Sequence, residues 1–93
     1  MGRETVLFKS EEKKDLSEVT AFLRTLADKL DQGEVVLRQG EQSVTIEVPA
    51  RVELEIKVEE EEGRNTTTRK LELEIEWPMN GDQGREGGEV ILD

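Results

Sequence analysis

The sequence predicts an α+β domain in which one amphipathic helix packs on a mostly antiparallel sheet of about five strands. The expected order along the chain is strand, helix and four strands. Apolar residues recur with the 3.6-residue period of a helix between residues 11 and 33. From Glu34 to Trp77 they alternate with the period of two that is typical of strands with one polar face. A sheet with a single apolar face needs one covering layer, so we expect the helix to supply it in a two-layer arrangement.

The expected helix carries a single apolar stripe and has recognisable ends. The stripe residues recur at i, i+3, i+4, i+7 and i+11, and they are Val19, Phe22, Leu23, Leu26 and Leu30. Two N-caps fit the sequence: Asp15, with Glu18 three residues later as a capping box, or Ser17. Gly33 is placed to end the helix in the left-handed conformation. Before the helix, residues 4–10 predict a short first strand that joins the sheet.

Turn residues set the expected pairing of the strands that follow the helix. Gly40 and Glu41 suit a type II′ hairpin turn, which sets Leu37 opposite Val44. Pro49-Ala50 predicts the next turn, so that the second and third strands of this meander would also pair.

Charge selects the register of the last hairpin. One register sets Glu59 opposite Lys70 and Lys57 opposite Glu72, and these pairs attract. A slip by one pair would set Lys57 against Lys70, which is unfavourable. The favoured register also aligns the apolar residues in four pairs: Val58 with Leu71, Ile56 with Leu73, Leu54 with Ile75, and Val52 with Trp77.

Length and composition indicate one domain followed by a tail. The chain has 93 residues, enough for one two-layer core. We expect the domain to cover residues 1–78 and a flexible, glycine-rich acidic tail to cover residues 79–93. The closing sequence EVILD is apolar enough to dock on this chain or on a neighbour, and the sequence leaves that question open.

The net charge and the residue types exclude several classes of partner. A formal charge of -10 makes nucleic acid and anionic membranes unsuitable, because both require basic surface. The chain has no cysteine, which excludes disulfides and zinc-thiolate sites. The first ten residues contain no apolar segment of a secretory signal, so we expect a cytoplasmic protein.

The ordered set of motifs resembles a known family. The segment LSEVTAFLRTLADKLDQGEV, the strands VPARVELEIKVEEEEG and the ending KLELEIEW together are similar to the amphi-Trp domain family. Its members are small prokaryotic proteins, named for an amphipathic strand that ends in tryptophan. The resemblance covers about residues 8–77 and leaves the segment from Met79 onward outside the family pattern. It implies a compact domain of unknown activity and transfers no catalytic residue.

Residue types also argue against an enzyme. The chain has no histidine, cysteine or tyrosine, so the usual base near pH 7 and the usual activated nucleophiles are missing. A pair of carboxylates needs a cleft to raise one pKa, and an open sheet face supplies none. We therefore expect no catalytic residues and no cofactor.

The acidic face of the predicted sheet is the candidate binding surface. The predicted registers place Glu47, Glu53 and Glu76 in one row across the strands, and Glu55 beside Glu74 in the next. Three interpretations remain open: a solvated face that keeps the sheet soluble, a docking surface for a basic protein segment, or a carboxylate site for Ca²⁺ or Mg²⁺.

Trp77 has two interpretations as well. It either closes the core at the end of the last strand or acts as a half-exposed aromatic anchor at an interface. The sequence thus predicts a non-catalytic protein-interaction or structural module, with a basic protein segment or a second copy of the chain as partner. The alternative is a ligand- or divalent-cation-binding domain that uses the acidic face.

Overall fold

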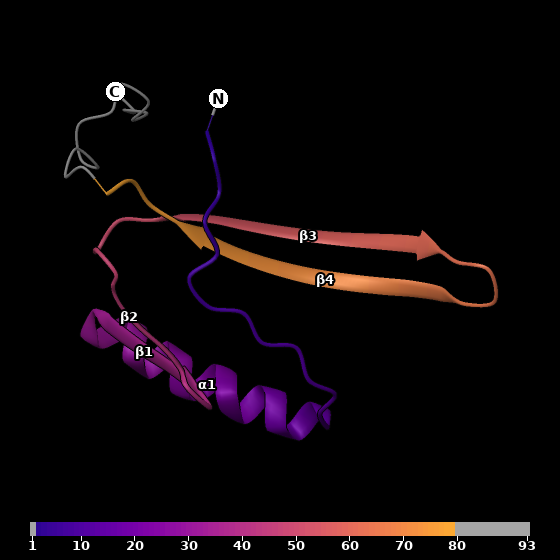
Figure 1. Cartoon of the computed structure of the whole chain (residues 1–93), viewed down its shortest axis with the longest axis horizontal. Helices are drawn as coiled ribbons and strands as arrows, with labels where there is room; N and C mark the ends of the chain where they lie inside the picture. The colour runs from indigo at the N-terminus through magenta and orange to yellow at the C-terminus, as the bar shows by residue number, and fades with distance from the viewer. Residues whose placement is uncertain (1, 80–93) are drawn as a thin grey trace, which may run out of the picture. The chain divides into compact units, whose positions relative to one another are not determined.

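The computed structural model describes residues 2–79, which form one helix and four strands (Figure 1). The helix α1 covers Leu16–Gln32, and the strands are β1 (Glu34–Gln39), β2 (Gln42–Glu47), β3 (Glu53–Glu62) and β4 (Thr67–Glu76). The chain divides into two units, Met1–Val48 and Pro49–Asp93, and each unit is described by itself. The predicted α+β class is confirmed.

The ends of α1 follow from local sequence. Asp15 is the N-cap, which decides between the two predicted caps, and its backbone N–H donates to Oε1 of Glu18 at 3.3 Å. At the other end Gly33 adopts φ 85°, and its N–H donates to the carbonyl of Leu30 at 3.0 Å. This left-handed conformation is open to glycine because it lacks a Cβ, so the helix ends where predicted.

The first unit has a small core at the junction of α1 and β1. The helix contacts β1, and Val35 is the buried apolar residue among residues 2–79, with 4% of its surface exposed. The stripe residues Leu26 and Leu30 are half-buried, whereas Phe22 and Leu23 are 54% and 45% exposed. Part of the predicted apolar stripe is therefore accessible in this structure.

The β1–β2 hairpin has the predicted register. Leu37 lies opposite Val44 and Val35 opposite Ile46. Gly40 has φ 58°, and no residue other than glycine among those described has a positive φ. A positive φ at the first turn residue alone is what a type II′ turn requires, so the position of the turn is confirmed.

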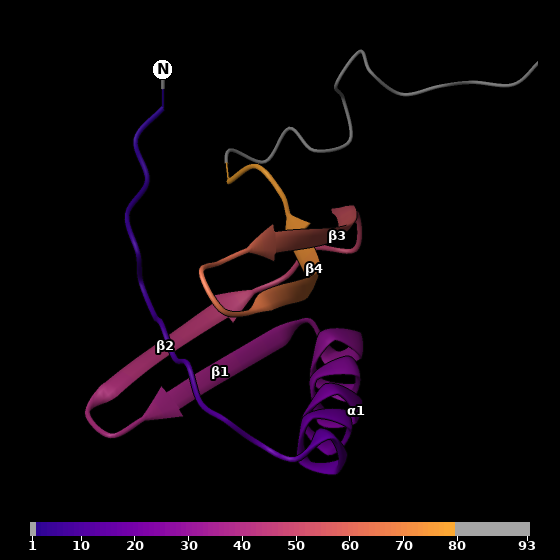
Figure 2. The ribbon, with the colours of Figure 1, turned by 90° about the vertical axis from the view of Figure 1, so that its right-hand side faces the viewer.

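The predicted first strand is wrong. Residues 2–15 contain no strand, and the N-terminal segment runs irregularly past the end of the β1–β2 hairpin (Figure 2). The side-chain amide of Gln42 takes the place of a paired strand there: its Nε2 donates to the Lys9 carbonyl at 3.1 Å, and its Oε1 accepts from the Lys9 N–H at 3.4 Å. One side chain thus holds both backbone polar groups of Lys9, and no backbone ladder forms.

The β3–β4 hairpin also has the predicted register. Val58 lies opposite Leu71, Ile56 opposite Leu73, and Leu54 opposite Ile75. The connecting loop is closed by the Gly63 N–H, which donates to the Thr66 carbonyl at 2.7 Å. The ladder ends at the pair of Glu53 and Glu76, so the expected pair of Val52 and Trp77 lies one position beyond it.

The single sheet of about five strands is a second correction. The four strands within residues 2–79 pair as two separate sheets, β1 with β2 and β3 with β4. The predicted tight turn at Pro49-Ala50 does not form: β2 ends at Glu47, β3 begins at Glu53, and the two strands do not pair. Proline has no N–H to donate to a ladder, and the Val48 N–H is used by the Gly33 carbonyl at 2.9 Å.

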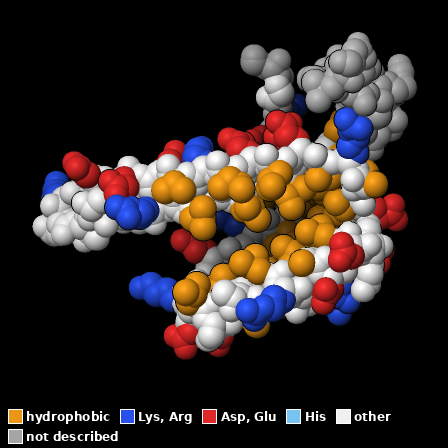
Figure 3. Space-filling model, turned by 180° about the vertical axis from the view of Figure 1, so that it is seen from behind, with side chains coloured by type: hydrophobic (Ala, Val, Ile, Leu, Met, Phe, Trp, Pro, Cys, Tyr) orange, Lys and Arg blue, Asp and Glu red, His pale blue; other side chains and the backbone are white. Residues whose placement is uncertain are grey.

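One face of the β3–β4 hairpin is apolar and accessible. Its side chains gather in a row along the hairpin (Figure 3). Five of them are between 56% and 75% exposed, whereas Ile75 is half-buried; the five are Leu54, Ile56, Val58, Leu71 and Leu73. An isolated two-stranded hairpin is marginally stable in water, so this face needs a cover. The predicted packing of the helix on Leu71, Leu73, Ile75 and Trp77 stays a prediction, because the two units are described separately.

The predicted tail falls almost entirely outside the described residues, since only Met79 of residues 79–93 is among them. The closing EVILD lies outside them too. In the described part of the chain, no helix has the length and apolar character that crossing a membrane requires.

Candidate functional site

Four glutamates of the β3–β4 hairpin form the candidate site, and we call them the acidic cluster: Glu53, Glu55, Glu74 and Glu76. Glu53 lies opposite Glu76, and Glu55 lies opposite Glu74. Because side chains alternate along a strand, these positions share the face opposite Leu54 and Ile75. The cluster occupies the end of the hairpin away from its loop.

The carboxylates of the acidic cluster approach one another closely. Oxygen atoms of Glu55, Glu74 and Glu76 all lie within 4.8 Å of one another. The hydrogen bond with Glu55 and the negative charges of Glu55 and Glu76 raise the pKa of Glu74. All three side chains are exposed, so water solvates the charges and the repulsion is weaker than it would be in a core.

The middle of the same face is electrically balanced. Lys57 Nζ lies 3.5 Å from a carboxylate oxygen of Glu59 and 3.8 Å from one of Glu72. Lys70 Nζ lies 3.6 Å and 3.7 Å from the same two glutamates. The four side chains alternate in sign around a closed network, and the neighbouring carboxylates raise the pKa of Lys57. Negative charge on this face is therefore concentrated in the acidic cluster.

Glu47 belongs to the other sheet, so the predicted row of Glu47, Glu53 and Glu76 across paired strands is wrong. Glu47 ends β2 and lies opposite Glu34 of β1. The expected row of Glu47, Glu53 and Glu76 depended on a turn at Pro49-Ala50 that does not form. The pairing of Glu34 with Glu47 could have been found from the sequence, because it extends the predicted register of Leu37 and Val44 by three residues.

Trp77 follows the last residue of β4 and is half-buried. The sheet ladder thus ends just before the ring, and both interpretations of this residue, core closure and interface anchor, stay predictions.

The chemistry open to the acidic cluster is ligation and charge pairing. Glu55, Glu74 and Glu76 could hold a hard divalent cation, which prefers several carboxylate and water oxygens. Acid–base catalysis would need a dry cleft, and these carboxylates lie on an exposed sheet face.

Sequence reasoning missed a second group of residues, in the first unit. The sequence places Phe22 in the apolar stripe of the helix, yet this side chain lines a groove together with Phe8 and Arg38. Periodicity assigned Phe22 to the helix correctly but placed Phe8 in a strand that does not form, and it carries no information on which side chains meet across elements.

The comparisons with known proteins identify the family of the chain. The family model of the Amphi-Trp domain matches residues 1–92. The chain belongs to the Amphi-Trp domain family. No curated protein and no solved structure matches it. In this Amphi-Trp domain the match continues past Trp77, so the segment from Met79 onward lies largely within the family pattern and not outside it.

Proposed function

We propose that this Amphi-Trp domain is a non-catalytic interaction module whose acidic cluster docks a basic segment of another protein. The observation that carries the proposal is the asymmetry of one sheet face. Four carboxylates gather at one end, with Glu55, Glu74 and Glu76 within 4.8 Å of one another, while the lysines of this face pair with Glu59 and Glu72 in the middle of the hairpin. A cationic partner would relieve the repulsion within the cluster.

The geometry of the cluster suits an extended peptide. Alternate residues along a strand lie on one face about 7 Å apart, and opposite residues on paired strands lie about 5 Å apart. A segment with lysine or arginine at every second position has the same spacing, so its cations can follow Glu53 and Glu55 along β3. In the two-layer arrangement that the sequence predicts, the apolar face is the core side, which leaves the acidic side to a partner.

The absence of an enzymatic role is part of the proposal. The sequence has no histidine or cysteine, and the clustered carboxylates are exposed to water. The net charge of -10 supports a cationic partner over nucleic acid or an anionic membrane. The cytoplasmic location expected from the sequence also stays a proposal, as does self-association, which light scattering on the purified chain can measure.

The second candidate function is binding of a divalent cation. It rests on the convergence of the Glu55, Glu74 and Glu76 carboxylates, which could supply three ligands to Ca²⁺ while water completes the shell. Cation binding that requires the folded hairpin would stabilise the domain by mass action.

A peptide titration with two variants tests the docking proposal. The peptide has alternating lysine and threonine, and binding is measured by calorimetry on the full chain. The Glu55→Gln/Glu74→Gln variant removes the centre of the cluster. The matched control, Glu61→Gln/Glu62→Gln, removes the same charge from the loop end of β3. We expect the peptide to bind the parent and the control but not the cluster variant.

If both variants bind the peptide more weakly than the parent by the same factor, net charge alone attracts the peptide, and the docking proposal would be wrong. For the cation, melting curves with Ca²⁺ are compared with curves in NaCl of the same ionic strength. A stabilisation specific to Ca²⁺ that the cluster variant abolishes would favour the second function.

A further inference from the structure

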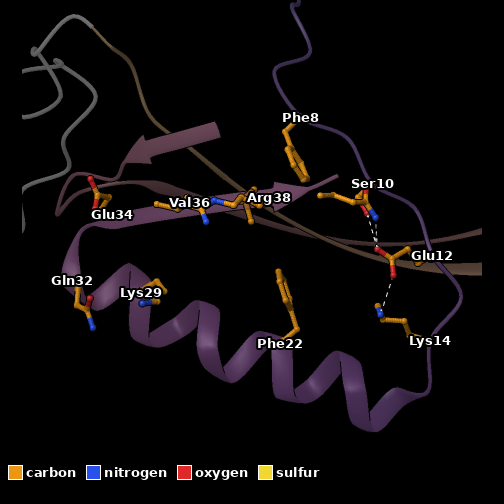
Figure 4. A pocket seen from close by; sticks show the side chains of 12 residues that line it. Phe8, Ser10, Glu12, Lys14, Phe22, Lys29, Gln32, Glu34, Val36 and Arg38 are labelled. Carbon is orange, nitrogen blue, oxygen red and sulfur yellow. Dashed lines mark hydrogen bonds and ion pairs between the residues drawn. The ribbon is translucent and has the colours of Figure 1, made fainter. Parts of the chain in front are cut away.

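A groove in the first unit is distinct from the acidic cluster. It has a volume of about 640 Å³ and lies between α1, β1 and the N-terminal segment (Figure 4). Small-molecule sites in proteins usually measure about 300–1,000 Å³. The groove is therefore large enough for a small organic ligand.

Two aromatic rings face each other across this groove. Phe8 comes from the N-terminal segment and Phe22 from α1, and their rings point toward one another from opposite sides (Figure 4). Phe22 is 54% exposed, which leaves a large apolar ring in contact with water. A planar apolar group placed between the two rings would cover both and could stack on them.

The end of the groove is built from a polar cross-link. Gln39 Nε2 of β1 donates to Oε2 of Glu12 at 2.7 Å, and Ser10 Oγ donates to the same oxygen at 3.2 Å. Lys14 Nζ lies 2.9 Å from Oε1 of Glu12, so these two charges neutralise each other. This cross-link joins the N-terminal segment to the end of β1, which suits a compact ligand better than a continuous peptide.

The remaining charges favour an anion. The groove is lined by three cationic side chains and two carboxylates, in a chain whose net charge is -10. Because Lys14 is paired with Glu12, three charged side chains of the groove remain: Lys29, Arg38 and Glu34. Within residues 2–79, neither Lys29 nor Arg38 makes a salt bridge. Arginine presents a planar fork of N–H donors that matches a carboxylate.

We propose that this groove binds a small aryl carboxylate, with the aromatic ring between Phe8 and Phe22 and the carboxylate at Arg38. The site is independent of the proposed function, because it lies in the other unit and selects the opposite charge.

Nuclear magnetic resonance on the ¹⁵N-labelled full chain tests the proposal with three probes of the same shape: 3-phenylpropionate, its neutral amide, and 3-phenylpropylammonium. We expect 3-phenylpropionate to shift the amide signals of α1 and β1 and to bind about tenfold more tightly than the neutral amide, as a charge-assisted hydrogen bond predicts. The ammonium compound should bind more weakly than either.

Three variants separate the two halves of the site. Arg38→Gln should reduce the affinity for 3-phenylpropionate to that of the neutral amide. Phe8→Ala should weaken the binding of both compounds, and because Phe8 lies outside every helix and strand, we expect this variant to keep its fold. The control Arg24→Gln removes a charge from an exposed helix position that does not line the groove, and it should change neither affinity. Equal affinities for the three probes, shifts confined to β3 and β4, or no shift at all would overturn the proposal.

Discussion

Glu55 of β3 lies directly opposite Glu74 of β4, and their carboxylate oxygens, together with one of Glu76, lie within 4.8 Å of one another. Like charges on facing positions of paired strands destabilise a sheet. The middle of the same hairpin is balanced by two lysines and two glutamates that form ion pairs. One strand pair thus contains a neutral region and a repulsive one.

The repulsion predicts a response to salt. We expect the melting temperature to rise smoothly with NaCl, because the Debye length falls from about 10 Å at 0.1 M to about 3 Å at 1 M. Replacing Glu53, Glu55 and Glu74 by glutamine should raise the melting temperature at low salt and flatten its salt dependence. Circular dichroism on the parent and the variant measures the melting temperature at each salt concentration. A variant that melts below the parent at low salt would show that these glutamates do not repel one another enough to destabilise the hairpin.

The raised pKa of Glu74 predicts a dependence on pH. Because Glu55 and Glu76 raise its pKa in the folded state above the ordinary 4.5, the folded chain holds this proton more tightly than the unfolded chain. The contribution of Glu74 to the free energy of unfolding therefore falls as the pH rises from about 4.5 through the pKa of the folded state. The Glu74→Gln variant should lose this decline relative to the parent. Denaturation at a series of pH values checks the difference, with Glu61→Gln as control.

Val35 carries the buried core of the first unit. Since it is 4% exposed, Val35→Ala should destabilise the chain by about 2 kcal/mol through lost burial and the cavity left behind. Val36→Ala is the matched control, because Val36 is 43% exposed on the neighbouring position. Urea denaturation should show a clearly smaller loss for the control, and equal losses would contradict the assigned core.

Leu23 and Leu73 test the two-layer prediction. Leu23 is 45% and Leu73 58% exposed in the structure. If the helix covers the second hairpin, both side chains become buried, and we expect Leu23→Ala and Leu73→Ala each to cost about 2–5 kcal/mol. Variants that both melt within about a degree of the parent would rule the two-layer arrangement out, since a loss of 1 kcal/mol already shifts the melting temperature by several degrees.

Gly33 is predicted to be essential for the turn from α1 into β1. A Cβ there would lie 3.7 Å from the Val48 carbonyl oxygen, an ordinary contact, so space is not the constraint. The constraint is φ 85°, which costs other residues about 1–2 kcal/mol. Gly33→Ala should lose about that amount in chemical denaturation, and Gly33→Asn should lose less, because asparagine tolerates this conformation better.

Several features of the molecule could be read from neighbouring residues. The capping box of Asp15 and Glu18, the stop at Gly33 and the turn at Gly40 each depend on a few adjacent positions. The registers followed from side-chain pairs, so the facing glutamates Glu55 and Glu74 were predicted correctly. Most of the candidate site was therefore accessible from the sequence.

The sequence by itself determined the helix with its two ends, the four strands that follow it and the pairing within each hairpin, because helix periodicity, caps and cross-strand pairs are local. Only the tertiary structure decided that Gln42 replaces a first strand at Lys9 and that Glu47 lies in a different sheet from Glu53. It also decided that Phe8 and Phe22 face one groove. These relationships join residues that are distant along the chain or separated by a turn that did not form. They depend on many weak contacts between different segments, and no short stretch of sequence contains all of those contacts.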